Sequence, residues 1–156
     1  MVPAGWRKAP GYFRSELAIS RHSALIDLVT IDRLKLDKAF KSQGKAANPA
    51  TDPLETGQLA VKEMKADPTY RSLELDRIEA AMVGGQPGFC ADSHFVRTYA
   101  DSTGVRIRQR LYGVVTNAGL YLLKLESLST VYFDENLAGF DAMVATLRLG
   151  SIKAKT

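Results

Sequence analysis

The sequence predicts an α+β domain in which helices pack against an antiparallel β-sheet. Three observations lead to this class: two segments with helical spacing of apolar residues, four late strand-like segments joined by short turns, and further strand-like segments before the first helix. Short turns make neighbouring strands antiparallel, so the four segments form a meander. The length of 156 residues suits one domain. We expect that domain at 12–149, with flexible segments at 1–11 and 150–156.

The chain before the first helix is predicted to be extended. Residues 12–20 alternate between apolar and polar side chains, which is the period of a half-buried strand. Residues 25–40 are rich in Ile, Leu and Val, so we expect a second extended segment, bent near Asp32. The small, polar run KSQGKAANPAT at 41–51 predicts a surface loop.

A helix over residues 53–65 is predicted by signals at both of its ends. Asp52 can accept hydrogen bonds from the free N–H groups of the first turn, and Pro53 fits the first helical position because it has no N–H. Glu55, three residues after Asp52, completes a capping-box pattern. The Asp-Pro dipeptide at 67–68 is expected to end the helix.

Four strands and one more helix are predicted after this point. The strands cover 73–82, 89–100, 105–116 and 120–127, and the turns between them contain GGQPG, DSTG and NAG. Helical spacing then predicts a helix over 132–147, whose buried side consists of Phe133, Leu137, Phe140, Val144 and Leu147. The order of strands, helix, meander and helix is typical of helices packed on one sheet.

Composition limits the classes of partner. The net charge of +4 is too modest for a nucleic-acid-binding surface, so no nucleic-acid partner is expected. The longest apolar stretch, residues 120–125, is too short to span a bilayer. Residues 1–11 lack the apolar region of a signal peptide. Two compartments stay open: the cell envelope or periplasm if an export signal has been removed from the native protein, and the cytoplasm otherwise.

The sequence contains no motif typical of catalysis, cofactor binding or metal binding. Cys90 and His94 share a strand face but lie roughly 13 Å apart by strand rise, too far for one metal ion. Ser93 points to the other face, so His94 cannot act as its base. Cys90 is expected to be buried and unreactive. We therefore expect no enzyme activity, no cofactor and no metal.

Arginines supply the candidate binding site. Arg106, Arg108 and Arg110 alternate along one strand and project from one face. The DSTG turn predicts that Arg97 lies opposite Arg108, and the next hairpin predicts Glu126 beside Arg110. One sheet face would then carry the candidate anion- or partner-binding set, which comprises Arg97, Tyr99, Arg106, Arg108, Arg110, Tyr112 and Lys124. The opposite face is expected to be apolar, and the alternative for the basic face is an ordinary solvated surface.

A family resemblance adds to this interpretation. The segment 88–149 resembles the C-terminal half of small bacterial proteins of the PsbP-like, Mog-type family, through PGFCADSHFVRTYADSTGVRIRQRLYGVV, GLYLLKLES and YFDENLAGFDAMVATLRL. The segments LVTIDRLKLDKAF and TDPLETGQL match the same pattern less sharply. The resemblance implies an α/β/α sandwich with a central antiparallel sheet. It also implies a binding or assembly role, because characterised members are such proteins and many bacterial members are exported lipoproteins of unknown function.

Two function classes follow from these observations. The first is a non-enzymatic binding or assembly module for an unknown protein or anionic partner, in the bacterial cell envelope. The alternative is a small ligand-binding protein or an enzyme whose site is assembled from dispersed residues. A flat basic face would favour the first class, and a pocket that holds a titratable pair would favour the second.

Overall fold

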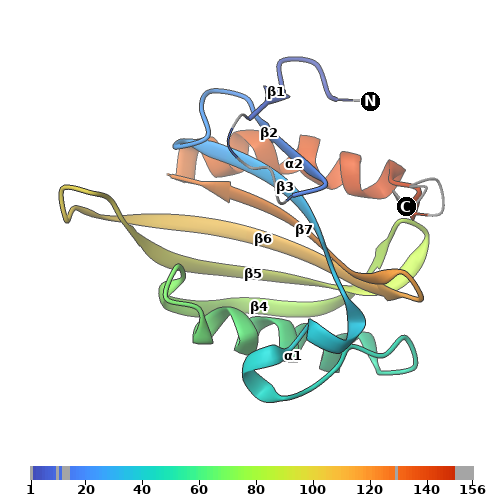
Figure 1. Ribbon diagram of the computed structural model, residues 1–156. Coiled ribbons are helices and arrows are strands. Elements are labelled where there is room, and N and C mark those ends of the chain that lie inside the picture. The colour runs from blue at the N-terminus through green and yellow to red at the C-terminus, as the bar shows by residue number, and fades with distance from the viewer. Residues whose placement is uncertain (1, 10, 12–14, 129, 150–156) are drawn as a thin grey trace.

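Seven antiparallel strands form one sheet in the computed structural model of the chain, which describes residues 2–9, 11, 15–128 and 130–149 (Figure 1). The strands lie in the order β1-β2-β3-β7-β6-β5-β4. Their bounds are Arg7–Lys8 (β1), Leu17–Ser20 (β2), Asp27–Leu34 (β3), Arg71–Val83 (β4), Gln86–Thr98 (β5), Gly104–Thr116 (β6) and Gly119–Ser127 (β7). The predicted meander is β4 to β7, and β3 pairs with its last strand.

Two α-helices in the described part of the chain cover opposite faces of the sheet. α1 (Pro53–Ala66) packs on β4 and β5, whereas α2 (Thr130–Thr146) packs on β7, β6 and β3. Figure 1 shows the twisted sheet running between them. The predicted α+β class is therefore confirmed, and its layers form an α/β/α sandwich. We call the two sides of the sheet the α1 face and the α2 face.

The start of α1 is the one that the capping signals predict. The Asp52 side chain accepts hydrogen bonds from the backbone N–H groups of Leu54 and Glu55, at 2.9 and 3.4 Å. Pro53 occupies the first turn, where its missing N–H costs no hydrogen bond. The helix ends at Ala66, close to the predicted end.

The strand predicted over 25–40 is wrong beyond Leu34. There the chain leaves the sheet and forms two short 3-10 helices, η1 (Leu36–Lys38) and η2 (Lys41–Gln43), the second inside the predicted loop. The N–H of Lys45 donates to the Phe40 carbonyl at 3.2 Å, which closes a tight turn. This turn places Phe40, only 1% exposed, in the core beside α1. The apolar residues after Leu34 are therefore buried in a turn. Their spacing in the sequence is the same as that of a buried strand, so the two structures could not be distinguished from it.

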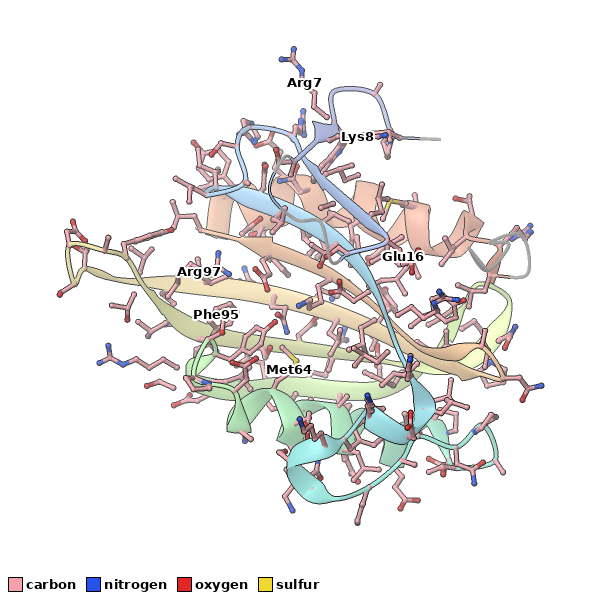
Figure 2. The ribbon with its side chains drawn as sticks, viewed as in Figure 1. Arg7, Lys8, Glu16, Met64, Phe95 and Arg97 are labelled. Atoms are coloured by element: carbon pink, nitrogen blue, oxygen red, sulfur yellow. The ribbon has the colours of Figure 1, made fainter. Side chains whose placement is uncertain are left out.

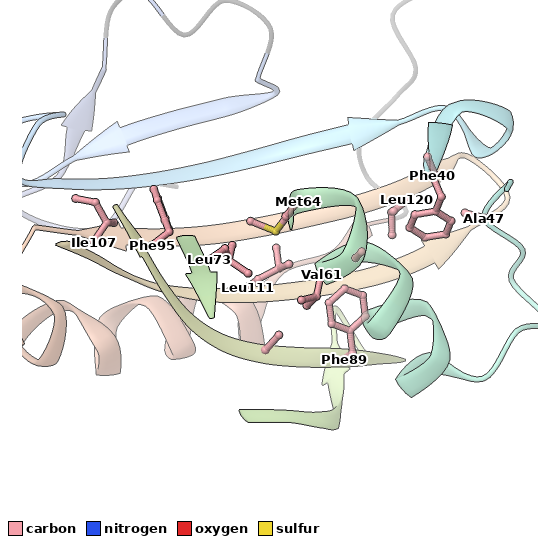
Figure 3. Packing of buried hydrophobic residues seen from close by; sticks show 13 residues of the cluster. Phe40, Ala47, Val61, Met64, Leu73, Phe89, Phe95, Ile107, Leu111 and Leu120 are labelled. Carbon is pink, nitrogen blue, oxygen red and sulfur yellow. The ribbon is translucent and has the colours of Figure 1, made fainter. Parts of the chain in front are cut away.

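Each face of the sheet has its own apolar core. Figure 3 shows the cluster on the α1 face, whose members include Val61, Met64, Phe89, Phe95, Ile107 and Leu111. The cluster on the α2 face includes Ile19, Val29, Leu123, Leu125, Phe140 and Val144. Because both faces are covered, the middle strands β3, β7 and β6 bury apolar side chains on both sides.

One aromatic ring fixes the distance between α1 and the sheet. Phe89 of β5 is fully buried and lies against two glycines. A Cβ atom at Gly57 of α1 would lie 2.8 Å from Cγ of Phe89, and one at Gly113 of β6 would lie 2.3 Å from its ring. Glycine is therefore required at both positions for the helix to approach this closely.

The N-terminal segment joins the sheet edge. β1 pairs with β2, and Val2 and Trp6 pack against the cluster on the α2 face. The mobility of residues 1–11 stays a prediction. The predicted tail at 150–156 lies outside the described residues, as do residues 12–14 of the first predicted strand. Among the described residues, no helix is both long enough and apolar enough to cross a membrane.

Candidate functional site

The β5–β6 pairing differs from the predicted one. Arg97 lies opposite Val105, and Arg108 lies opposite His94. The loop between the strands spans 99–103 and is longer than the predicted turn. Relative to the predicted pairing, the register of β6 against β5 is shifted by an odd number of residues. Side chains alternate between the two faces along a strand, so an odd shift exchanges the faces. Arg97 therefore projects from the face opposite to that of Arg108.

The β6–β7 pairing is also shifted. Glu126 lies opposite Gln109, and Arg110 lies opposite Leu125, because the hairpin has a loop of two residues, 117–118. The prediction of one basic face is therefore wrong, and both faces are largely apolar under their helices. The α2 face carries Arg106, Arg108, Arg110 and Tyr112, the α1 face carries Arg97 and Lys124, and Tyr99 lies in the β5–β6 loop. Anion binding by these residues stays a prediction.

On the α2 face, Arg110 is bound by carboxylates. Its guanidinium donates to both oxygens of Asp92, at 2.7 and 2.8 Å, and to Asp141 of α2 at 2.9 Å. The hydrogen bonds to Asp92 are the main reason why the pKa of Arg110 is raised. The Tyr112 hydroxyl donates to the other oxygen of Asp141 at 2.8 Å. This network attaches α2 to the sheet.

Arg108 has a similar role nearer the start of α2. Its Nη1 lies 3.3 Å from a carboxylate oxygen of Asp134, and its guanidinium carbon lies 4.2 Å from the centroid of the Phe133 ring. Sequence reasoning missed these partners because Asp134 and Asp141 belong to a helix, and strand pairing alone does not place them. Their spacing of seven residues, two turns of a helix, is the signal that could have found them.

On the α1 face, a charged pair lies among apolar side chains. Arg97 donates to Glu126 at 2.6 Å, and its guanidinium carbon lies 5.5 Å from the centroid of the Phe95 ring. Figure 2 labels Arg97 and Phe95 on β5 and Met64 on α1. Glu126 is only 7% exposed, so its charge is balanced inside the protein by Arg97.

Beside this pair lies a pocket of about 300 Å³ between α1 and strands β3 and β7, which we call the Lys124 pocket. Its apolar walls include Leu34, Phe40, Met64, Leu120 and Leu122. Lys124 of β7 donates to the Tyr70 hydroxyl at 2.7 Å, and its Nζ lies 3.9 Å from Oδ2 of Asp32. Tyr70, just after α1, packs its ring edge-on against Phe95. Apolar walls with a few converging polar groups are typical of ligand sites.

Both titratable groups at this point stay protonated near neutral pH. Burial raises the pKa of Tyr70. Burial alone would lower the pKa of Lys124, but Tyr70, Glu126 and Asp32 together raise it. The pocket therefore presents an ammonium and a phenol, and both are hydrogen-bond donors. Of the predicted site residues, only Lys124 lines this pocket, and the sequence analysis did not identify Tyr70 or Asp32. The sequence signal for the pocket is the single lysine in the apolar run LYLLKL.

A larger cavity of about 680 Å³ lies at the other end of α1. The turn before α1, the β4–β5 turn and the β6–β7 hairpin line it. Its single ionisable lining residue among those described, Asp52, is already used to cap the helix. This cavity therefore lacks the converging charged groups of the Lys124 pocket.

The two nucleophile candidates of the sequence, Cys90 and Ser93, are buried in the sheet. Cys90 is 4% exposed, and burial together with Asp92 raises the pKa of its thiol to about 11. Ser93 faces Gln109 on the α1 face, whereas His94 lies on the other face, as predicted, with its ring nitrogens near Glu74 and Asp76. Across the described ranges, no group of three or more metal-ligand side chains comes together.

A histidine–carboxylate pair that the sequence did not reveal lies at the start of β3. Nδ1 of His22 is 2.5 Å from Oδ2 of the fully buried Asp27. Ser127 pairs with Asp27 across the strands, but its buried hydroxyl has no hydrogen-bond partner among the described residues. The three side chains therefore do not form a catalytic triad.

Comparison with known proteins supports the fold. No family model and no curated protein matches the chain. CyanoP, the PsbP of Synechocystis sp. PCC 6803, is similar with a TM-score of 0.51 and 16% identity over 93% of this chain and 81% of that one. PA94 of Pseudomonas aeruginosa, a protein of unknown function, is similar with a TM-score of 0.53 and 10% identity, over 91% of this chain and 79% of that one. LpqN of Mycobacterium tuberculosis, which is involved in cell envelope biogenesis, has a TM-score of 0.48 and 14% identity, over 92% of this chain and 77% of that one. The chain thus has a PsbP-like fold.

Proposed function

We propose that this protein is a non-enzymatic binding module that takes a small ligand into the Lys124 pocket. The observation that carries the proposal is the pairing of an apolar pocket with the Lys124–Tyr70 hydrogen bond at its wall. The basic face that would have favoured docking of a large acidic partner is divided between two covered faces. A pocket with a titratable pair is the feature expected of the small-ligand class.

The chemistry of Lys124 and Tyr70 favours binding over catalysis. Both Lys124 and Tyr70 have raised pKa values, so neither can act as a general base near neutral pH. Cys90 and Ser93 do not line the pocket. Binding is therefore the activity that these groups support best.

The test uses three amphiphiles that share an eight-carbon chain: 1-octanol, octanoate and octylamine. Amide chemical shifts of the isotope-labelled protein should move around Leu34, Tyr70 and Leu122 with at least one of them. Leu122→Phe and Leu34→Phe narrow the pocket from two walls and should weaken that binding at least about ten-fold. Gln86 lines the larger cavity and not the Lys124 pocket, so Gln86→Phe is the matched control. The proposal is wrong if no probe shifts pocket amides or if the pocket-narrowing variants bind as well as the wild type.

A further inference from the structure

We infer that the ligand of the Lys124 pocket is a monocarboxylate with a short hydrocarbon body, bound through its carboxylate to Lys124 and Tyr70. The inference rests on the proposed function and names the class of ligand. Two observations on hydrogen bonding support it: Lys124 has unused donors, and Tyr70 places a second donor beside them. The walls and rim of the pocket then favour the same ligand class.

The Lys124 ammonium has unused donors. An ammonium can donate three hydrogen bonds. Among the described residues, Tyr70 is the acceptor within hydrogen-bond distance, and the Asp32 carboxylate at 3.9 Å is beyond it. Glu126, the other carboxylate that acts on Lys124, is already bound by Arg97 at 2.6 Å. A cation with only 15% of its side chain exposed gains when an anion or water fills these positions.

Tyr70 supplies a second donor beside the first. Its oxygen accepts from Lys124, so its own O–H proton is left to donate, and among the described residues it donates no hydrogen bond. Ammonium and phenol are 2.7 Å apart. Two adjacent donors of this kind suit the two oxygens of one carboxylate, and the bonds are strengthened by the opposite charges.

The rest of the pocket selects the body of the ligand. Its volume of about 300 Å³ holds roughly ten non-hydrogen atoms, at about 30 Å³ for each water-sized group. The apolar walls named above suit a hydrocarbon chain. At the rim, Asp32 accepts from Ser15 at 2.6 Å, and Glu63 accepts from Ser42 and Gln43. With Asp67, these carboxylates outnumber Arg33, the other cation of the lining besides Lys124, so a second negative charge on the ligand is disfavoured and a monoanion is favoured over a phosphate or a dicarboxylate.

The experiment compares head groups and then removes the charge. Calorimetric titration of the wild type at low salt should rank octanoate above 1-octanol and octylamine. Lys124→Gln should weaken octanoate about ten- to hundred-fold, the range for one lost charge-assisted hydrogen bond, and should weaken the uncharged 1-octanol by a smaller factor. Tyr70→Phe should weaken octanoate about two- to ten-fold. Lys62→Gln makes the same charge change on the exposed side of α1 and should alter neither ligand.

The outcomes separate the two proposals. If none of the three probes binds, both fail. If 1-octanol or octylamine binds at least as tightly as octanoate, and Leu122→Phe abolishes that binding, the pocket is a ligand site and the carboxylate inference is wrong. Unchanged octanoate affinity in Lys124→Gln would overturn the inference as well. The comparison of head groups uses the wild-type chain alone, so it decides the question even if a variant fails to fold.

Discussion

Replacing Asp27 with alanine is expected to be among the most destabilising single changes in this protein. The carboxylate is fully buried and accepts four hydrogen bonds, from the backbone N–H groups of Arg21 and His22 at 2.9 and 3.0 Å, from the His22 ring at 2.5 Å and from Asn136 of α2 at 2.9 Å. It therefore joins the loop before β3 to the helix on the α2 face.

The expected cost follows from what the change leaves behind. Asn136 is 1% exposed, so its amide would stay buried without its acceptor, while the two backbone N–H groups could reach water. Removing one partner of a buried charged network costs about 3–5 kcal/mol, and we expect this range for Asp27→Ala. Asp27→Asn keeps the shape and one acceptor, so its cost should be about 1–3 kcal/mol.

The pH dependence gives an independent check. Burial alone would raise the pKa of Asp27, but the hydrogen bonds from His22, Arg21 and Asn136 outweigh it and hold the pKa below its ordinary value of 3.8. A lowered pKa in the folded state stabilises the fold above the unfolded-state value, and this contribution is lost as the pH falls through the folded-state pKa. The unfolding free energy of the wild type should therefore fall more steeply below pH 3.8 than that of Asp27→Asn.

Urea denaturation followed by circular dichroism, from pH 7 down to pH 3, measures both effects. Asp37→Asn removes an exposed carboxylate from η1 and is the control. A loss below about 1 kcal/mol for Asp27→Ala, or parallel pH curves for the wild type and Asp27→Asn, would refute the reasoning, because the four hydrogen bonds to Asp27 would then contribute far less than expected.

Three further changes test the packing. Phe140→Ala should cost about 3–5 kcal/mol in denaturant melts, because the ring is 2% exposed, whereas Val131→Ala on the exposed side of α2 should cost little. Gly113→Ala should cost about 1–3 kcal/mol through its clash with the ring of Phe89, and Phe89→Leu in the same chain should recover part of that loss. The Cys90 thiol, with its pKa raised to about 11, should resist a disulfide reagent at pH 8 in the folded protein and react on unfolding; rapid reaction of the folded protein would contradict its burial.

Local chemistry made most of the fold predictable. Asp52 predicts the start of α1, because helix capping depends on residues only a few positions apart in the sequence. The meander is predicted by the short turns between its strands. Strand register is decided differently. The segment between Tyr99 and Gly104 can close as a shorter or a longer loop, and a change of one residue moves every side chain of the next strand to the other face. The arginine set was therefore assigned to one face although its members lie on two.

The Lys124 pocket was beyond local reasoning for a different reason. Its polar groups Asp32, Tyr70 and Lys124 come from β3, the segment just after α1, and β7, and no spacing in the sequence relates Tyr70 to Lys124. Burial of a lysine in an apolar strand is visible in the sequence. The partner that makes such burial tolerable is determined by tertiary packing, and only the structure identifies it.

The position of β7 has a consequence for the unfolded chain. β7 lies between β3 and β6 and is covered on both faces, so its sequence is nearly continuous in apolar residues. From Gly119 to Leu125, Lys124 is the one charged residue. Segments of this kind self-associate into cross-β aggregates while a sheet is still forming, and a single internal charge suppresses that association. We therefore expect Lys124 to lower the tendency of the unfolded chain to aggregate, a use of its charge that does not depend on the pocket.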